Sequence, residues 1–167
     1  MTPDSARCMA QYNQWFNTKL YRAASQLPEV DYYLDRQLYF GSIHKTLNHL
    51  LLADRIWLGR FTGVPYHAER LDQVLYADLK TLGEARTQTD RQIIDWAAGL
   101  TRTHLEGDLR YTSIVTREEK RGPLWEFVLH FFNHQTHHRG QVTAALSQAG
   151  LDYGVTDLIG MPQGNAR

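Results

Sequence analysis

The stretch PLWEFVLHFFNHQTHHRGQVTAALSQAG, which spans Pro123–Gly150, combines a helical hydrophobic repeat with three histidines in five consecutive positions. Proline is tolerated at the start of a helix and glycine commonly follows the end of one, so both limits are typical helix boundaries. With successive residues about 100° apart around the helix axis, the apolar side chains fall on one arc. These side chains are Leu124, Phe127, Val128, Phe131, Val142, Ala145, Leu146 and Ala149. We therefore predict a long helix that packs one face against other helices.

Three more segments have the same helical periodicity, and glycine or proline separates them. They are expected at residues 3–27, 41–65 and 78–105. Within the third segment, Thr81 and Glu84 have the spacing of a capping box, in which two side chains cap the first helical turn. The stretch DLRYTSIVTREEKRGP before the last helix is rich in β-forming residues around a charged turn. It is expected to form a short hairpin or an extended excursion.

These elements predict an all-α fold, a four-helix bundle with a short extended excursion before the last helix. A chain of 167 residues is long enough to bury a core without disulfides, and we expect one domain over residues 1–167. The core of such a bundle is a common place for metal ions and ligands.

The composition argues against several classes of protein. Lys+Arg and Asp+Glu each total 18, and the one charge-dense run, REEKR, is mixed in sign, whereas a nucleic-acid-binding protein needs a basic face. No segment approaches the roughly 20 apolar residues that span a bilayer, and the start of the chain has no apolar signal core. We therefore expect a cytoplasmic protein with neither nucleic acid nor membrane as a partner. A lone cysteine, Cys8, excludes an intramolecular disulfide.

The helical repeat of the last segment separates its histidines. His138 falls inside the apolar arc and His134 at its edge, whereas His137 and His130 are rotated toward the polar side. His134 and His138, four residues apart, share a face and can converge on one atom. A single histidine on an apolar face is usually a hydrogen-bonded core residue, but two buried imidazoles side by side both need a partner, which a shared cation supplies.

His49, in the second helical segment, is the best candidate for a third ligand because apolar residues surround it on the core side. His44 lies about 140° away around the same helix and cannot share its direction. His49, His134 and His138 would provide three nitrogen ligands from two helices. Three protein ligands with an open fourth position are typical of a chemically active divalent site, whereas structural sites usually have four.

Other residues near this cluster are weaker candidates. Gln141 or Asp54 would orient a nucleophile or accept a proton, although a glutamine or aspartate on a helix is normally solvated. Arg139 would steer an anionic substrate, although a surface arginine is the more ordinary interpretation. Nothing in the sequence identifies the small-molecule substrate.

Three stretches carry a resemblance to a known family: YNQWFNTKL near the start, LNHLLLADRIWLGRF in the second helical segment and HFFNHQTHHRGQV in the last. Together with GVTDLIG near the end, they resemble the DinB-like (DinB/YfiT) family, in order and over nearly the whole chain. The most specific part is the H-x-x-x-H-R-G-Q pattern combined with the upstream Asn-His pair.

The resemblance implies a four-helix bundle that carries a divalent metal, with zinc or nickel the expected ions, and that is frequently a homodimer. The family's ligand positions match His49, His134 and His138 here. Better-understood relatives are metal-dependent enzymes that use low-molecular-weight thiols such as bacillithiol, mycothiol or glutathione. The leading hypothesis is therefore a metal-dependent thiol transferase or hydrolase. The alternatives are a non-enzymatic metal- or haem-binding bundle and a stress-related structural dimer.

Overall fold

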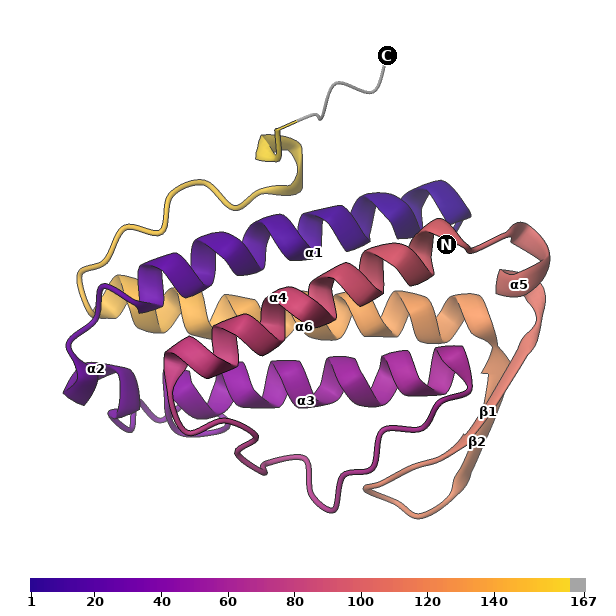
Figure 1. Ribbon diagram of the computed structural model, residues 1–167, viewed down its shortest axis with the longest axis horizontal. Coiled ribbons are helices and arrows are strands. Elements are labelled where there is room, and N and C mark those ends of the chain that lie inside the picture. The colour runs from indigo at the N-terminus through magenta and orange to yellow at the C-terminus, as the bar shows by residue number, and fades with distance from the viewer. Residues whose placement is uncertain (163–167) are drawn as a thin grey trace.

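Four long helices form the framework of the computed structural model, which describes residues 1–162 of the chain. They run alongside one another (Figure 1) as a bundle, so the predicted all-α four-helix fold is confirmed. The long helices are α1 (Pro3–Ala24), α3 (Ile43–Thr62), α4 (Leu79–Ala98) and α6 (Leu124–Gln148). Shorter elements are α2 (Glu29–Tyr33), α5 (Arg102–Glu106) and the 3-10 turn η1 (Leu158–Gly160).

The boundaries of α3 follow from its end residues. The Ser42 side chain accepts a hydrogen bond from the backbone N–H of Lys45, which satisfies one free donor of the first turn. Gly63 ends the helix with a φ of 73°, a left-handed conformation that glycine adopts without strain. The predicted limits of this helix are confirmed, and they fix the position of His49 along the bundle.

The third predicted segment begins where expected, but its capping residue and its C-terminal end differ from the observed structure. The carboxylate of Asp78 accepts a hydrogen bond from the backbone N–H of Thr81 and caps α4, so the capping box predicted at Thr81 and Glu84 is wrong. The segment also divides at Gly99, and a second short helix, α5, begins after Thr101, whose side chain caps it. An aspartate just before a helix competes with a threonine three residues later, and here the aspartate prevails.

The predicted hairpin is also confirmed. Strand β1 (Asp108–Thr112) pairs antiparallel with β2 (Glu119–Pro123), and β2 leads directly into α6. The hairpin extends from the start of α6 past the end of α3 (Figure 1). Its tip, residues 113–118, therefore lies on the side of the bundle formed by α3 and α6.

A buried ion-pair network joins α3 and α4 in the interior of the bundle. Nη1 of Arg86 lies 2.6 Å from a carboxylate oxygen of Asp54, and its Nη2 lies 2.9 Å from Asp90. Gln135 of α6 donates a hydrogen bond to Asp54, and Asn17 of α1 donates to Asp90. All four long helices therefore contribute to one polar network inside an otherwise apolar core.

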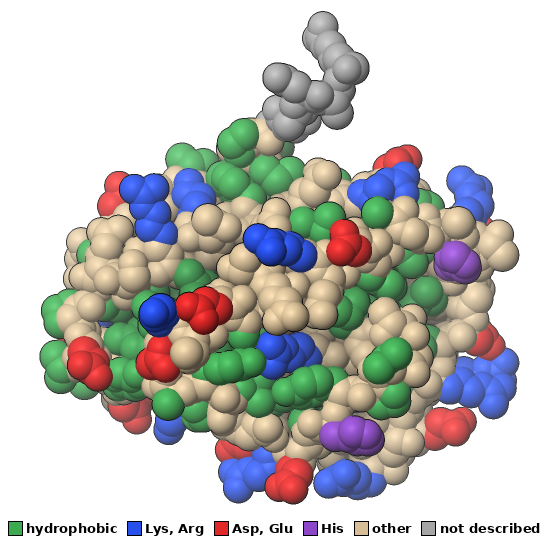
Figure 2. Space-filling view, viewed as in Figure 1, with side chains coloured by type: hydrophobic (Ala, Val, Ile, Leu, Met, Phe, Trp, Pro, Cys, Tyr) green, Lys and Arg blue, Asp and Glu red, His purple; other side chains and the backbone are tan. Residues whose placement is uncertain are grey.

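Within residues 1–162, no helix combines the length and the apolar character needed to cross a bilayer. Figure 2 shows charged side chains of both signs interspersed over one face of the molecule, with hydrophobic side chains between them.

Candidate metal site

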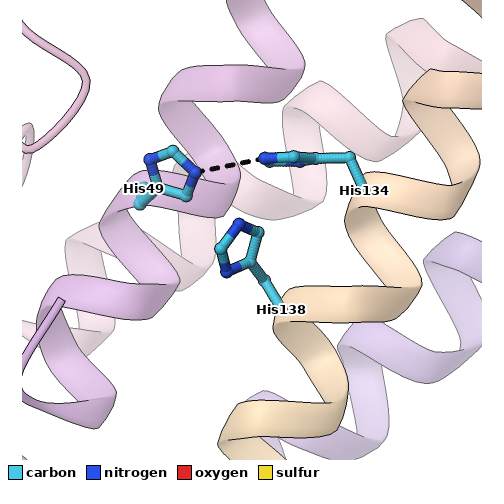
Figure 3. Close-up of side chains that lie close together, drawn as sticks. All are labelled: His49, His134 and His138. Atoms are coloured by element: carbon cyan, nitrogen blue, oxygen red, sulfur yellow. Dashed lines mark hydrogen bonds between the residues drawn. The ribbon is translucent and has the colours of Figure 1, made fainter. Parts of the chain in front are cut away.

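Three imidazoles converge between α3 and α6. His49 extends from α3, His134 and His138 extend from successive turns of α6, and the three rings point toward one another (Figure 3). One nitrogen from each ring lies within 4.8 Å of the other two. The Nε2 atoms of His49 and His134 are 3.3 Å apart. The arrangement brings together the three residues that the sequence singled out.

The three rings are shielded from solvent to different degrees. His49 and His138 are buried, and His134 is half-buried. Burial lowers the pKa of His49 to about 4, and burial together with the neighbouring His138 and His49 lowers the pKa of His134 to about 3. The pKa of His138 is also lowered, chiefly by burial. All three imidazoles are therefore neutral at pH 7, which is the form that binds a metal ion.

Hydrogen bonds on the outer side of the cluster fix the tautomers of two rings. Nδ1–H of His49 donates to the backbone carbonyl of Leu71 at 2.8 Å, and Nδ1–H of His138 donates to Oε1 of Gln141 at 2.9 Å. Each ring therefore carries its proton on Nδ1 and keeps the lone pair of Nε2 available. Such outer hydrogen bonds are the usual way in which proteins orient histidine ligands.

The donor set fits a small divalent cation. Zinc binds imidazole nitrogens at about 2.0–2.1 Å in a tetrahedron, which places two ligand nitrogens about 3.3–3.4 Å apart. The Nε2 atoms of His49 and His134 have that separation. That pair is therefore already spaced for a shared ion, and the three imidazoles together could hold a metal ion.

The cluster lies in the wall of a cleft of about 790 Å³. Phe40 covers one side of it, with its ring stacked on His49 at a centroid distance of 3.9 Å. Ile114 and Val115, at the tip of the hairpin, line another side, and the loop that contains Leu71 lines a third. The three histidines are therefore accessible to a small molecule through a largely apolar opening.

The other histidines near the cluster lie where the helical repeat predicted. His137 and His130 are exposed on α6. His44 is buried away from the cluster, where its Nδ1 lies 3.1 Å from the hydroxyl of Tyr32. The structure brings none of these three into the group that can share one ion.

Of the three weaker candidates, Gln141 lies beside the cluster, whereas Asp54 and Arg139 are buried in the core. Gln141 contacts the cluster through His138, as the hydrogen bond above shows. Asp54 does not line the cleft, because it is buried and paired with Arg86 and Gln135. The interpretation of Arg139 as a surface residue is wrong. Its side chain is fully buried, donates to Oδ1 of Asn13 and lies over the ring of Phe16.

Several contacts around the cluster have no signal in the sequence. The carbonyl of Leu71 reaches His49 through the path of a long loop, and Phe40 reaches it from the segment before α3. Neither contact follows a helical or strand repeat. The tip of the hairpin likewise reaches the cleft only because of the direction in which the hairpin extends.

Comparisons with known proteins agree with the helical-bundle fold described above. The family model described as DinB family matches residues 2–165. The chain belongs to the DinB family. Protein DinB of Bacillus subtilis (strain 168) is 27% identical over 169 residues, which cover 92% of this chain and 91% of that protein. The crystal structure of a DinB-like protein from Bacillus cereus shares the fold, with a TM-score of 0.63 at 18% identity, over 84% of this chain and 89% of that one.

In this member of the DinB family, Gln141 is expected to act on a metal ion through His138. Replacing Gln141 with leucine removes the acceptor of the Nδ1 proton and should weaken zinc binding about 10- to 100-fold, the usual effect of losing such a partner. Gln141→Glu keeps an acceptor oxygen and should retain the affinity. Competition with a chromophoric chelator measures both. Equal affinities for Gln141→Leu and the unmodified protein would show that Gln141 does not orient His138.

Proposed function

We propose that this protein is a divalent-metal-dependent enzyme of the thiol transferase or hydrolase class, with His49, His134 and His138 as the ligands. The observation that carries the proposal is the convergence of three imidazoles on an accessible cleft, with no fourth metal-binding side chain grouped with them in residues 1–162. A site with three protein ligands leaves a position for a reactant, whereas a structural zinc site is normally closed by a fourth ligand.

The chain's own residues prepare the site before any substrate arrives. The carbonyl of Leu71 and the amide of Gln141 hold Nδ1–H of His49 and His138, so both rings present Nε2 to the cleft. Phe40 limits the access of water to His49 by stacking on its ring. When bound, a divalent ion supplies Lewis acidity that lowers the pKa of a thiol or a water molecule toward neutrality.

Zinc or nickel is the ion that we propose, because neutral imidazole suits both metals. The proposed cosubstrate is a low-molecular-weight thiol, and a small molecule that enters the cleft is the second reactant. A cytoplasmic location belongs to the same proposal, since thiols are kept reduced in that compartment. A haem is a poorer fit, because the Nε2 atoms of His49 and His134 are only 3.3 Å apart and leave no space for a porphyrin between them.

Cobalt substitution tests whether the site is open. Protein loaded with Co²⁺ should change its visible spectrum when glutathione or 2-mercaptoethanol is added, and a sulfur-to-cobalt charge-transfer band should appear. Hydroxyl analogues of the same thiols, which lack sulfur, serve as the control. A spectrum that excess thiol and azide leave unchanged would indicate a closed site and favour a bracing metal in a structural protein.

A homodimer remains part of the proposal. The exposed hydrophobic side chains of the chain include Tyr39, Val115 and Ile159, and a dimer interface would cover some such surface. We expect light scattering at micromolar concentration to give about twice the mass of the 19.3 kDa chain. A mass near that of one chain at the same concentration would contradict the prediction.

A further inference from the structure

A second, smaller cavity adjoins the histidine cluster on the side toward the end of α3. It has a volume of about 260 Å³, and His49 and His134 form part of its wall as well as part of the wall of the larger cleft. The hairpin residues Ile114 and Val115 also border both spaces. The proposed metal site therefore lies at the junction of two hollows.

Arg60 lies in the wall of this cavity, on the same face of α3 as His49. The two residues are eleven positions apart, which is close to three full turns, and Ala53 and Ile56 between them line the same cavity. Side chains on a helix lean toward its N-terminus, so the guanidinium of Arg60 is directed back along α3 toward His49. The eleven-residue spacing by itself indicates that Arg60 and His49 share one face of the helix.

Two aromatic rings hold the guanidinium in position. Its Cζ lies 3.9 Å from the ring centre of Tyr111 in β1 and 4.5 Å from that of Trp57 in α3. Stacking of this kind suits arginine because its guanidinium is planar and weakly hydrated. The two contacts restrict the head group without occupying its in-plane N–H donors.

The charge of Arg60 has no counter-charge in the part of the chain that the structure describes. Arg86 and Arg36 are paired with Asp54 and Asp31, and Arg139 and Arg55 donate hydrogen bonds to neutral side chains. For the Arg60 side chain, neither an ion pair nor a hydrogen bond is found within residues 1–162. No aspartate or glutamate lines the cavity. Burial lowers the pKa of Arg60, and its charge helps to lower the pKa of His130, which lines the same space.

A structural role accounts for only part of these observations. Arg60 is in the last turn of α3, where a positive charge interacts favourably with the helix dipole. That role needs neither a cavity free of acidic residues nor two rings that leave the N–H donors free. A partly desolvated cation without a partner, beside a reactive cluster, is the arrangement expected of an anion-binding residue.

We propose that Arg60 binds the carboxylate of a small organic acid in this cavity and so places the rest of that molecule beside His49 and His134. The apolar and aromatic walls favour an acid with a hydrocarbon or aromatic body. That this acid is a substrate rests on the function proposed above, whereas its binding to Arg60 does not. Arg60 is thus a residue that sets substrate specificity, and it takes the role that Arg139 cannot have in the core.

Benzoate, with benzamide as the uncharged match, is the probe for this proposal. Titration calorimetry should show benzoate binding to the unmodified protein, a loss of about 10- to 100-fold in affinity in Arg60→Gln, and little binding of benzamide to either. Arg55→Gln is the matched control, since Arg55 also stacks on aromatic rings of the same bundle, Tyr66 and Tyr76, but lines neither space beside the histidines. It should bind benzoate as the unmodified protein does.

Each titration is carried out on chelator-treated and on zinc-loaded protein, so that the anion site and the metal site are judged separately. Benzoate binding that depends on Arg60 in both forms supports the proposal, even if zinc fails to bind and the proposed function is wrong. Equal affinity of Arg60→Gln and the unmodified protein, or equal binding of benzoate and benzamide, overturns it.

If Arg60→Gln does not fold, Arg60→Lys, which keeps the charge and loses the planar stacking, should still show at least about a 5-fold weaker affinity for benzoate. An unchanged affinity in that variant also overturns the proposal.

Discussion

The His138→Ala variant is expected to lose its divalent metal ion, with a fall in zinc affinity of more than about 100-fold. That exceeds the 10- to 100-fold effect of losing an outer hydrogen-bond partner, because a ligand itself is removed. His49→Ala and His134→Ala should behave alike, since each contributes one of three converging nitrogens. The neutral imidazoles impose little proton competition at pH 7, so the loss reflects the missing ligand. Elemental analysis after gel filtration gives the metal content per chain.

His137→Ala and His44→Ala provide the matched controls. His137 is next to His138 in the chain but exposed, and His44 is buried on the same helix as His49 but bonded to Tyr32. Both variants should keep their metal. If His137→Ala empties the site while His138→Ala retains zinc, the ligand assignment is wrong.

The helical repeat was sufficient to find the candidate ligands because it acts over a short distance in the chain. His134 and His138 are one turn apart on a face that the apolar residues define, and His49 lies on the core side of α3. The exposure of His137 and His130 follows from the same repeat. A pattern of this kind reports which side of a helix faces the core, and it placed these histidines as the structure has them.

The expectation for Arg139 came from its residue type and was wrong. Arginine is usually solvated, whereas the buried face of α6 is wider than the apolar arc and includes Gln135 and Arg139. Asp54 of α3 is also buried, because Arg86 and Gln135 on other helices bond to its carboxylate. Whether a charge is solvated or paired in the core depends on residues far away in the chain, and no local pattern contains that information.

The contacts that complete the site depend on tertiary structure as well. Phe40, the carbonyl of Leu71 and the hairpin tip reach the cluster through loops whose paths the sequence does not specify. Arg60 is an intermediate case. Its place on the face of His49 follows from spacing alone, but its lack of a carboxylate partner in residues 1–162 required the structure.

The buried ion-pair network should be the most sensitive part of the core. We expect Arg86→Met to lower the free energy of unfolding by about 3–5 kcal/mol, and the melting temperature by roughly 10 °C, because Asp54 and Asp90 then remain in the interior without a cation. Burial by itself would lower the pKa of Arg86, but these two carboxylates more than offset it and hold the pKa above its ordinary value. Urea denaturation followed by circular dichroism measures the loss.

The pH dependence of that loss separates uncompensated charge from lost packing. Burial raises the pKa of Asp54 and Asp90 above that of an unfolded chain, and Arg86 opposes the increase. Without Arg86, both folded pKa values should rise further. A carboxyl with a raised folded pKa destabilises the fold most above that pKa, and its penalty shrinks as the pH falls from the folded pKa toward the lower pKa of the unfolded chain. The stability deficit of Arg86→Met should therefore shrink as the pH is lowered from 7 toward about 4, the ordinary pKa of aspartate.

Arg7→Met is the control for this measurement, because Arg7 pairs with Asp4 on the surface of α1 and such exposed pairs contribute little. It should change the free energy of unfolding by less than about 1 kcal/mol and show no such pH trend. A deficit of Arg86→Met that is equally small, or that does not change with pH, would mean that the network adds no net electrostatic stability. In that case the three side chains would be retained for the packing and register of α3 and α4, a role that buried polar groups have in some helical assemblies.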